Sequence, residues 1–351
     1  MTIVEARGTI GFVIASAIAA ATVFSCRPEP GLGSIALARK GGLHVVDLAT
    51  CRDRIVGRGG KGKVTFRPDG RPHMVPYRGP VRVVTPDGAM RAEVRSSGKG
   101  KTAKQTIWVT NTGTQRSHPV FSETQSYKTI GPGETPGPIM LLGSSGDYNW
   151  VFFMIDPGGS GSIAADGLTL RVVSTGHSRA IRIARMLPYA DYLTWCGRKL
   201  VMTAGSWRVA TDRKRLLVAS PPNWRPRRLV AMPNRSWGSL ACSPGRASLV
   251  AQSQTQSDVP NFFATHWALW RVGLDGSTRR LTSPPPGFAD ESPRFSRTGN
   301  VLLFVRSRKG SGKLYALRAA RLAGPLLSVG NSLGYYGHQN WWFSADWSTG
   351  S

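Results

Sequence analysis

Short apolar runs alternate with turn-forming residues along most of the chain. Val301–Val305 and Lys313–Leu317, for example, are separated by the charged, glycine-containing stretch Arg306–Gly312. Runs of β-branched and aromatic residues of this length predict β-strands, and glycine, serine and charged residues between them predict tight turns. Few segments show the spacing of an amphipathic helix. The pattern therefore predicts an all-β protein.

The same group of strands recurs along the chain. A tight turn follows the first strand of each unit, and the turns lie at Gly88, Asp147, Gly197, Gly245, Gly299 and Asp346, in steps of 59, 50, 48, 54 and 47 residues. Recurrence at about 40–50 residues, with several strands per unit, is typical of β-propeller blades. We therefore predict antiparallel four-stranded blades.

The two ends of the chain complement each other. Asn340–Asp346 reads as a first strand with no later strands, whereas Ser34–Val56 supplies three strands with no first strand before them. Joining them makes one blade, which would place Trp342 and Ile35 in the same sheet and remove exposed sheet edges. We predict one domain, residues 34–348, as a six-bladed propeller closed by its N- and C-terminal strands. Five or seven blades remain open if Val64–Tyr77 is a strand and not a connection.

One unit resembles a known family. Phe295-Ser296-Arg297-Thr298-Gly299, followed by Val301–Val305 and Lys313–Leu317, is similar to a repeat of the TolB-like, WD-type propellers, with Arg297-Thr298 in place of Pro-Asp. The resemblance implies a bacterial exported protein that binds partner proteins at the ring face. It also implies that Asp290 is a blade-linking residue whose carboxylate caps backbone amides.

The N-terminus predicts export. Arg7 precedes the apolar run Ile10–Phe24, which is too short for a bilayer span and matches the core of a signal peptide. We expect a signal peptide at 1–25 and a short linker at 26–33. Val23–Cys26 resembles a bacterial lipobox, in which Cys26 is lipidated and anchors the protein to a membrane. A secreted protein cleaved near Ser25 and an uncleaved signal anchor are the alternatives.

Four cysteines allow two patterns. Cys196 and Cys242 fall at corresponding places in consecutive repeats, which favours a disulfide between them outside the cytoplasm. If Cys26 is lipidated, an odd cysteine remains; if it is not, Cys26–Cys51 is the second bridge. No Cys-x-x-Cys occurs and the six histidines are not paired, so we expect no metal and no cofactor.

The chain is strongly basic. Lysine and arginine total 46 against 19 acidic residues, for a formal net charge of +27. They are spread over the whole length, so a nucleic-acid groove is not indicated. Either this excess of basic residues serves no binding partner, or it attracts an anionic envelope polymer or lipid headgroups.

No catalytic motif is recognised, so we predict a non-catalytic binding or scaffold protein at the cell envelope, with a protein partner. The long polar insertion 122–138 is the preferred contact surface. The candidate binding residues there and near blade beginnings are Glu123, Tyr127, Lys128, Trp195, Trp237, Tyr335, His338 and Trp341. The alternative is a hydrolase or lyase acting on envelope glycan or peptide through Glu123, Glu134 or Asp290.

Overall fold

The computed structural model describes residues 25–39, 41–58, 62–67, 71–76, 82–85, 88–98, 104–124, 139–145, 147, 149–155, 167–244, 248–256, 266–331, 336–339, 341–343 and 345–348. Within these ranges the chain is almost entirely β-structure. Its helical segments there are the 3₁₀ turns η4 (Ala190–Tyr192) and η5 (Trp341–Phe343). None of the helices in this described part is long and apolar enough to cross a membrane. The predicted all-β class is confirmed.

The strands form six four-stranded antiparallel sheets and one two-stranded sheet in the described residues. The first sheet has the order β26 (Ala345–Ser348), β1 (Ser34–Arg39), β2 (Gly42–Asp47) and β3 (Asp53–Gly57). The two-stranded sheet is β4 (Gly62–Phe66) with β5 (Pro72–Pro76). The next sheet is β6 (Arg82–Val84), β7 (Met90–Ser97), β8 (Lys104–Asn111) and β9 (Ser117–Thr124).

The remaining sheets follow in chain order. One is β10 (Ile139–Ser144), β11 (Trp150–Ile155), β12 (Leu168–Ser174) and β13 (Ile181–Met186). Then come β14 (Leu193–Cys196), β15 (Lys199–Ala204), β16 (Arg215–Ala219) and β17 (Arg227–Arg228). The last two are β18 (Arg235–Cys242), β19 (Ser248–Thr255), β20 (Ala268–Gly273) and β21 (Thr278–Arg280), and β22 (Ala289–Phe295), β23 (Val301–Arg308), β24 (Ser311–Arg318) and β25 (Arg321–Asn331).

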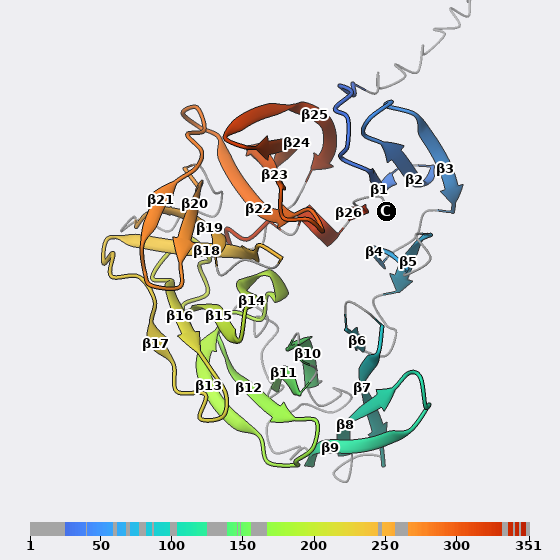
Figure 1. Ribbon diagram of the computed structural model, residues 1–351, viewed down its shortest axis with the longest axis vertical. Coiled ribbons are helices and arrows are strands. Elements are labelled where there is room, and N and C mark those ends of the chain that lie inside the picture. The colour runs from blue at the N-terminus through green and yellow to red at the C-terminus, as the bar shows by residue number, and fades with distance from the viewer. Residues whose placement is uncertain are drawn as a thin grey trace, which may run out of the picture.

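The sheets are arranged around a central space, as Figure 1 shows, with successive sheets side by side. This is the arrangement of β-propeller blades. It explains why β23 reads Val-Leu-Leu-Phe-Val, buried at all five positions, instead of alternating apolar and polar. A strand covered on both faces by neighbouring sheets needs apolar side chains on both faces.

The last strand lies a few residues later than the sequence predicts. Strand β26 begins at Ala345 and pairs antiparallel with β1, so that Ile35 lies opposite Trp347 and not beside Trp342 in the sheet. Trp342 belongs to the 3₁₀ turn η5 before the strand. The two ends of the chain thus share a sheet, but Trp342, which was predicted to lie in that sheet, does not belong to it. Three consecutive large side chains, Trp341-Trp342-Phe343, favoured the wrong segment because they resemble a strand in composition.

Residues 64–77, whose role the sequence left open, contribute the β4–β5 hairpin. Its Val64 is buried and packs with Ala36, Leu43 and Val45 of the first sheet. The predicted count of six blades is therefore not confirmed as a count of sheets, because a seventh, smaller sheet is present.

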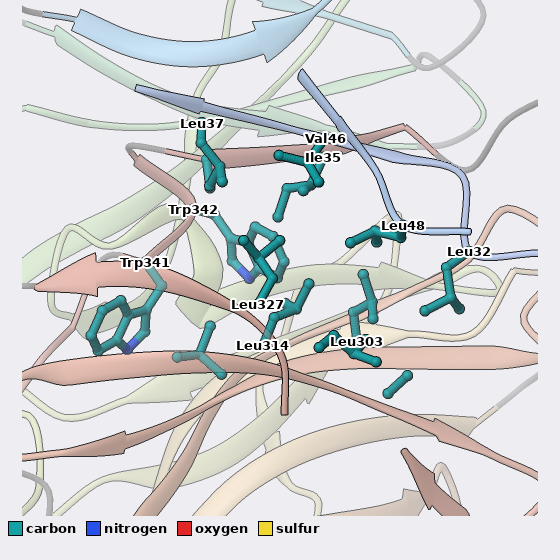
Figure 2. Packing of buried hydrophobic residues seen from close by; sticks show 14 of the residues in the cluster. Leu32, Ile35, Leu37, Val46, Leu48, Leu303, Leu314, Leu327, Trp341 and Trp342 are labelled. Carbon is teal, nitrogen blue, oxygen red and sulfur yellow. The ribbon is translucent and has the colours of Figure 1, made fainter. Parts of the chain in front are cut away.

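Buried apolar clusters join neighbouring sheets. The cluster in Figure 2 packs Leu303, Leu314 and Leu327 of β23–β25 against Ile35 and Leu37 of β1. Comparable clusters lie between each following pair of sheets from β6–β9 round to β22–β25. Burial of one such side chain contributes about 1.5–3 kcal/mol. Among the described residues, no such cluster joins β4–β5 to β6–β9.

The segment 26–33, predicted to be a linker, is part of the packed domain. The amide of Arg27 donates to the carbonyl of Leu326 at 2.7 Å, that of Glu29 donates to Leu48 at 2.7 Å, and Leu32 is buried in the cluster of Figure 2. These contacts bind the segment to β25 and to the end of β2. The predicted signal peptide lies outside the described residues up to position 24.

Both disulfides are present. Cys196 is bonded to Cys242, the pair that the repeat positions favour, and Cys26 is bonded to Cys51. A lipid thioether would need the same Cys26 sulfur as this second bridge. The structure agrees with the second of the two alternatives, and lipidation of Cys26, which would require this bridge to be absent, stays a prediction.

Candidate functional site

A cavity of about 1420 Å³ lies in the central space between the sheets. Its wall includes the innermost strands β10, β14, β18, β22 and β26, together with β4 and residues 188–191. Because successive first strands converge on one axis, each contributes one or a few side chains to a shared surface. Leu141, Leu142, Tyr189, Phe295 and Trp342 make much of that surface apolar and aromatic.

A cluster of hydrogen bonds on the cavity wall centres on Asp191 of η4. Its carboxylate accepts from Nε2–H of His338 at 2.9 Å and from the hydroxyl of Ser239 at 2.5 Å. The ring of Tyr189 stacks on the His338 ring, with centroids 3.7 Å apart and planes 5° apart, and Tyr192 meets it edge-on. These contacts fix the imidazole in one orientation at the cavity surface.

The Asp191 carboxylate is held in its charged form. Burial by itself raises the pKa of Asp191, but the charge of His338 and the hydrogen bonds from His338 and Ser239 outweigh burial and lower the pKa below its usual value. The wall therefore carries one fixed negative charge paired with an imidazole.

Cations surround the rest of the cavity. Arg294 pairs with Asp346, and its guanidinium carbon lies 4.3 Å from the centroid of the Trp342 ring. Lys63 and Arg297 also line the cavity, and neither has a hydrogen-bond or ion-pair partner among the described residues. Loss of bulk water and the nearby charge of Arg294 lower the pKa of Lys63. The wall thus offers two unpaired cations to a ligand.

Behind the wall lies a second buried carboxyl group. Glu291 accepts hydrogen bonds at Oε2 from Nε1–H of Trp341 and from the hydroxyl of Ser307, each at 2.8 Å. Its Oε1 has no hydrogen-bond partner among the described residues. Burial raises the pKa of Glu291 to about 8, despite the opposing effect of those two hydrogen bonds. This carboxyl group is therefore mostly neutral at pH 7.

The hydrogen-bonded cluster around Asp191 does not have the arrangement of a serine-hydrolase catalytic triad. In a serine hydrolase the histidine lies between the serine and the aspartate, so that it can take the serine proton. Here the carboxylate of Asp191 lies between Ser239 and His338, and Ser239 donates to a carboxylate with a lowered pKa. A glycosidase needs two carboxylates facing one sugar, and Asp191 is the one acidic residue among the described residues of this wall. No group of three metal-binding side chains occurs in the described part of the chain.

The structure places His338, one of the predicted binding residues, on the cavity wall. Trp341 is buried and hydrogen-bonded to Glu291, and Trp237 is buried between the sheets of β14–β17 and β18–β21. These two indoles are corrected to core residues. Trp195 packs on Phe152 and is also part of a core cluster.

Among the other predicted contacts, Glu123 lies in β9, the outermost strand of its sheet. It is not brought together with Asp290, which is fully buried in β22 and receives two hydrogen bonds from Arg306 at 2.6 and 2.8 Å. The expectation that the Asp290 carboxylate caps backbone amides is thus corrected to an ion pair. Tyr127, Lys128, Glu134 and Tyr335 lie outside the described residues.

Sequence reasoning missed Asp191, Lys63 and Arg297. Lys63 directly precedes the segment Val64–Tyr77, and Arg297 stands at a position where the turn motif has another residue. Asp191 is a lone acidic residue between two strands, so no local spacing marks it. All three residues lie at or next to the inner edge of a sheet. Extending each predicted first strand to its ends could have identified such positions.

The comparisons with known proteins find no matching family model and no matching curated protein. Several solved structures are similar. TolB from Acinetobacter baumannii has 14% identity and a TM-score of 0.44, covering 86% of this chain, which spans 64% of that one. The β-propeller domain of the Trilobed protease from Pyrococcus furiosus has 11% identity and a TM-score of 0.44, over 80% of this chain and 73% of that one.

An oligogalacturonate lyase in complex with manganese has 13% identity and a TM-score of 0.45, over 85% of this chain and 74% of that one. These neighbours include a TolB protein as well as a protease domain and a lyase. At such identities and TM-scores the likenesses do not separate a binding protein from an enzyme. The chain is similar to TolB-like β-propeller proteins in its arrangement of strands.

Proposed function

We propose that this protein is an exported, non-catalytic β-propeller that binds a segment of a partner protein in its central cavity. The observation that carries the proposal is the cavity itself. Its apolar and aromatic wall, with Trp342 and Tyr189, suits side chains of a peptide, while Lys63 and Arg297 suit an acidic side chain or a terminal carboxylate. The fixed Asp191–His338 pair supplies a polar contact of defined geometry.

The proposal includes a ring of six full blades plus the small β4–β5 sheet. Strand β26 and the cluster of Figure 2 would hold the last full blade to the first. The main chain of Phe66 donates to the Asp346 carboxylate at 2.9 Å, so the small sheet is also bound to β26 at the cavity edge. A rigid wall of this kind lowers the entropic cost of binding.

A location outside the cytoplasm is part of the proposal. All four cysteines are paired in two disulfides, which persist in oxidising compartments and are rare in the cytosol. The export signal predicted at 1–25 is consistent with that location. Because Cys26 is in a disulfide, the proposal involves no lipid at this residue.

The proposal is tested by capturing partners on the purified, immobilised protein from envelope and extracytoplasmic fractions of the source cells. Wild type is compared with Arg297→Glu, which reverses one unpaired charge of the cavity, and with Arg227→Glu. Arg227 is an exposed residue of β17 outside the cavity, so it controls for the same change in net charge. We expect one protein to be retained by wild type and Arg227→Glu and lost with Arg297→Glu.

The enzyme alternative gives a different result. An enzyme acting at this cavity would turn over glycan or peptide fragments, and Asp191→Asn would abolish that turnover without lowering the unfolding temperature. Such turnover, or partner capture that Arg297→Glu leaves intact, would overturn the proposed function.

A further inference from the structure

Two hollows adjoin each other at the ends of β16 and β18, away from the central cavity. Their volumes are about 510 and 310 Å³, and they share the side chains of Arg213 and Arg215. Neither shares a lining residue with the central cavity. Because the same two residues border both, the hollows lie side by side, and we refer to the pair as the groove.

The groove is lined by cations. Arg185 borders the larger hollow, and Arg228 and Arg235 border the smaller one, whereas the lining of neither contains an acidic residue. Asp212 lies 3.4 Å from Nε of Arg213. In the described part of the chain, no carboxylate pairs with Arg215, Arg228 or Arg235. Guanidinium groups bind carboxylate, sulfate and phosphate oxygens through two parallel hydrogen bonds.

Buried contacts on the inner side of the loop that carries this groove hold the loop in place. The ammonium of Lys214, which is fully buried, donates to the carbonyls of Trp207, Val209 and Asp212 at 2.6, 2.8 and 2.9 Å. Gly205 has φ +142°, and a Cβ there would lie 2.6 Å from the carbonyl oxygen of Arg213. The loop backbone is therefore fixed before any ligand binds.

Trp207 adds an aromatic surface to the cations. It lines the larger hollow and is 46% exposed, the one aromatic among the exposed large hydrophobic residues of the described chain. The guanidinium of Arg213 lies 5.9 Å from the centroid of its ring. An exposed indole of this kind offers a flat apolar face beside charged groups, a surface on which the ring of a sugar can stack.

We propose that this groove binds an acidic polysaccharide, with its anionic groups on Arg213, Arg215, Arg228 and Arg235 and one sugar ring on Trp207. A linear chain fits because the two hollows lie side by side, so that successive sugar units can reach both, with Arg213 and Arg215 between them. The shared chemistry is a sugar ring that carries a carboxylate or a sulfate.

Other polyanions fit the observations less well. Two disulfides indicate an oxidising compartment, where a polysaccharide is a more suitable partner than a nucleic acid. An anionic bilayer presents a flat surface, and a single exposed Trp207 in a hollow offers little apolar area to it. The proposal goes beyond the cavity function and does not depend on it.

The test measures binding of two oligosaccharides by calorimetry at several salt concentrations. Alginate fragments carry carboxylates, and heparin fragments carry sulfates. Polyphosphate serves as a polyanion without rings, and single-stranded DNA and anionic lipid vesicles serve as competing classes. The variants are Arg215→Glu, Trp207→Ala and the matched control Arg227→Glu, which changes the same net charge in the same sheet.

We expect at least one of the two oligosaccharides to bind. Arg215→Glu should weaken that binding about tenfold or more, and Arg227→Glu less than about twofold, which corresponds to the loss of one charge-assisted contact. Trp207→Ala should weaken oligosaccharide binding about tenfold and leave polyphosphate binding within about twofold. Unfolding temperatures of all variants should match, because Lys214 contacts the Trp207 carbonyl and not its ring.

Three results would overturn the inference. The first is absence of binding to both oligosaccharides, and the second is equal weakening of oligosaccharide binding by Arg215→Glu and Arg227→Glu. The third is tighter binding of DNA or vesicles than of either oligosaccharide, with no effect of Trp207→Ala on oligosaccharide binding. Arg215→Glu should leave capture of the cavity partner unchanged, so this inference and the proposed function can fail separately.

Discussion

Two adjacent carboxyl groups in β22 meet different partners. Asp290 faces the guanidinium of Arg306, which binds both of its oxygens, whereas Glu291 faces an indole and a hydroxyl, which are neutral donors. Because consecutive strand residues point to opposite faces, one sequence step separates an ion pair from a carboxyl group that is mostly neutral at pH 7. The dipeptide Asp-Glu in the sequence gives no sign of this difference.

Glu291 makes stability depend on pH. Its pKa is raised from 4.5 in the unfolded chain to about 8 in the native protein, so its contribution is fully present below pH 4.5 and is lost as pH rises through 8. Glu291→Gln keeps acceptors for Trp341 and Ser307 and cannot ionise. Thermal unfolding should show the variant gaining on wild type between pH 5 and pH 8 and levelling off above that. Parallel curves for the two proteins over that range would contradict this assignment.

The Asp290–Arg306 pair should be sensitive to removal of the cation. The Asp290 side chain is fully buried and that of Arg306 is 10% exposed, so Arg306→Met leaves a buried carboxylate without its partner. Loss of one member of a buried pair costs about 3–5 kcal/mol. Urea unfolding should show this loss, and Asp290→Asn in the same chain should restore part of it. A double variant no more stable than Arg306→Met would argue against pairing as the cause.

At the scale of elements, the strands were largely predictable. The strand signals at Val301–Val305 and Lys313–Leu317 locate β23 and β24 to within a few residues, because short apolar runs between glycine-containing turns leave few alternatives. The final strand was less predictable, since Trp341 and Trp342 have strand-like composition but are held in η5 by hydrogen bonds to Glu291 and Ser292. Tertiary contacts there override local preference.

The Cys196–Cys242 disulfide joins the first strands of two neighbouring sheets, β14 and β18, across 46 residues of sequence. Closing a loop of this length stabilises the native state by about 2–4 kcal/mol. The double variant Cys196→Ser/Cys242→Ser should therefore lose about that much in urea unfolding. Peptide mapping without reduction is the matching control, and free thiols at both positions in the wild-type protein would remove the basis for this expectation.

At the scale of the whole molecule, the recurrence of similar four-stranded sheets was predictable but the site was not. Repeats of similar length are visible in sequence, whereas the central cavity combines a few residues from each of six strands with residues between strands, such as Asp191 and His338. Each alone resembles an ordinary surface or strand residue. These residues come together only because the first strands converge, so a search for local sequence motifs does not find them.

Strand β26 is the element on which the arrangement depends most. It supplies four residues that pair with β1, and Ala345 belongs to the cluster that joins β1 and β2 to β23–β25. Asp346 in addition binds Arg294 and the main chain of Phe66. Truncation after Phe343 would leave the edge of β1 unpaired and expose part of that cluster to water.

We therefore expect the protein truncated after Phe343 to lose its single cooperative thermal transition and to bind the dye ANS, as proteins with exposed apolar surface do. Truncation after Ser348 keeps all of β26 and should unfold like the full-length chain. If both truncated proteins unfold at the same temperature as wild type, β26 does not hold the first sheet to the last. In that case the cavity would have an open side between them, and the aromatic wall at Trp342 and Trp347 could not be the rigid surface that the proposed partner requires.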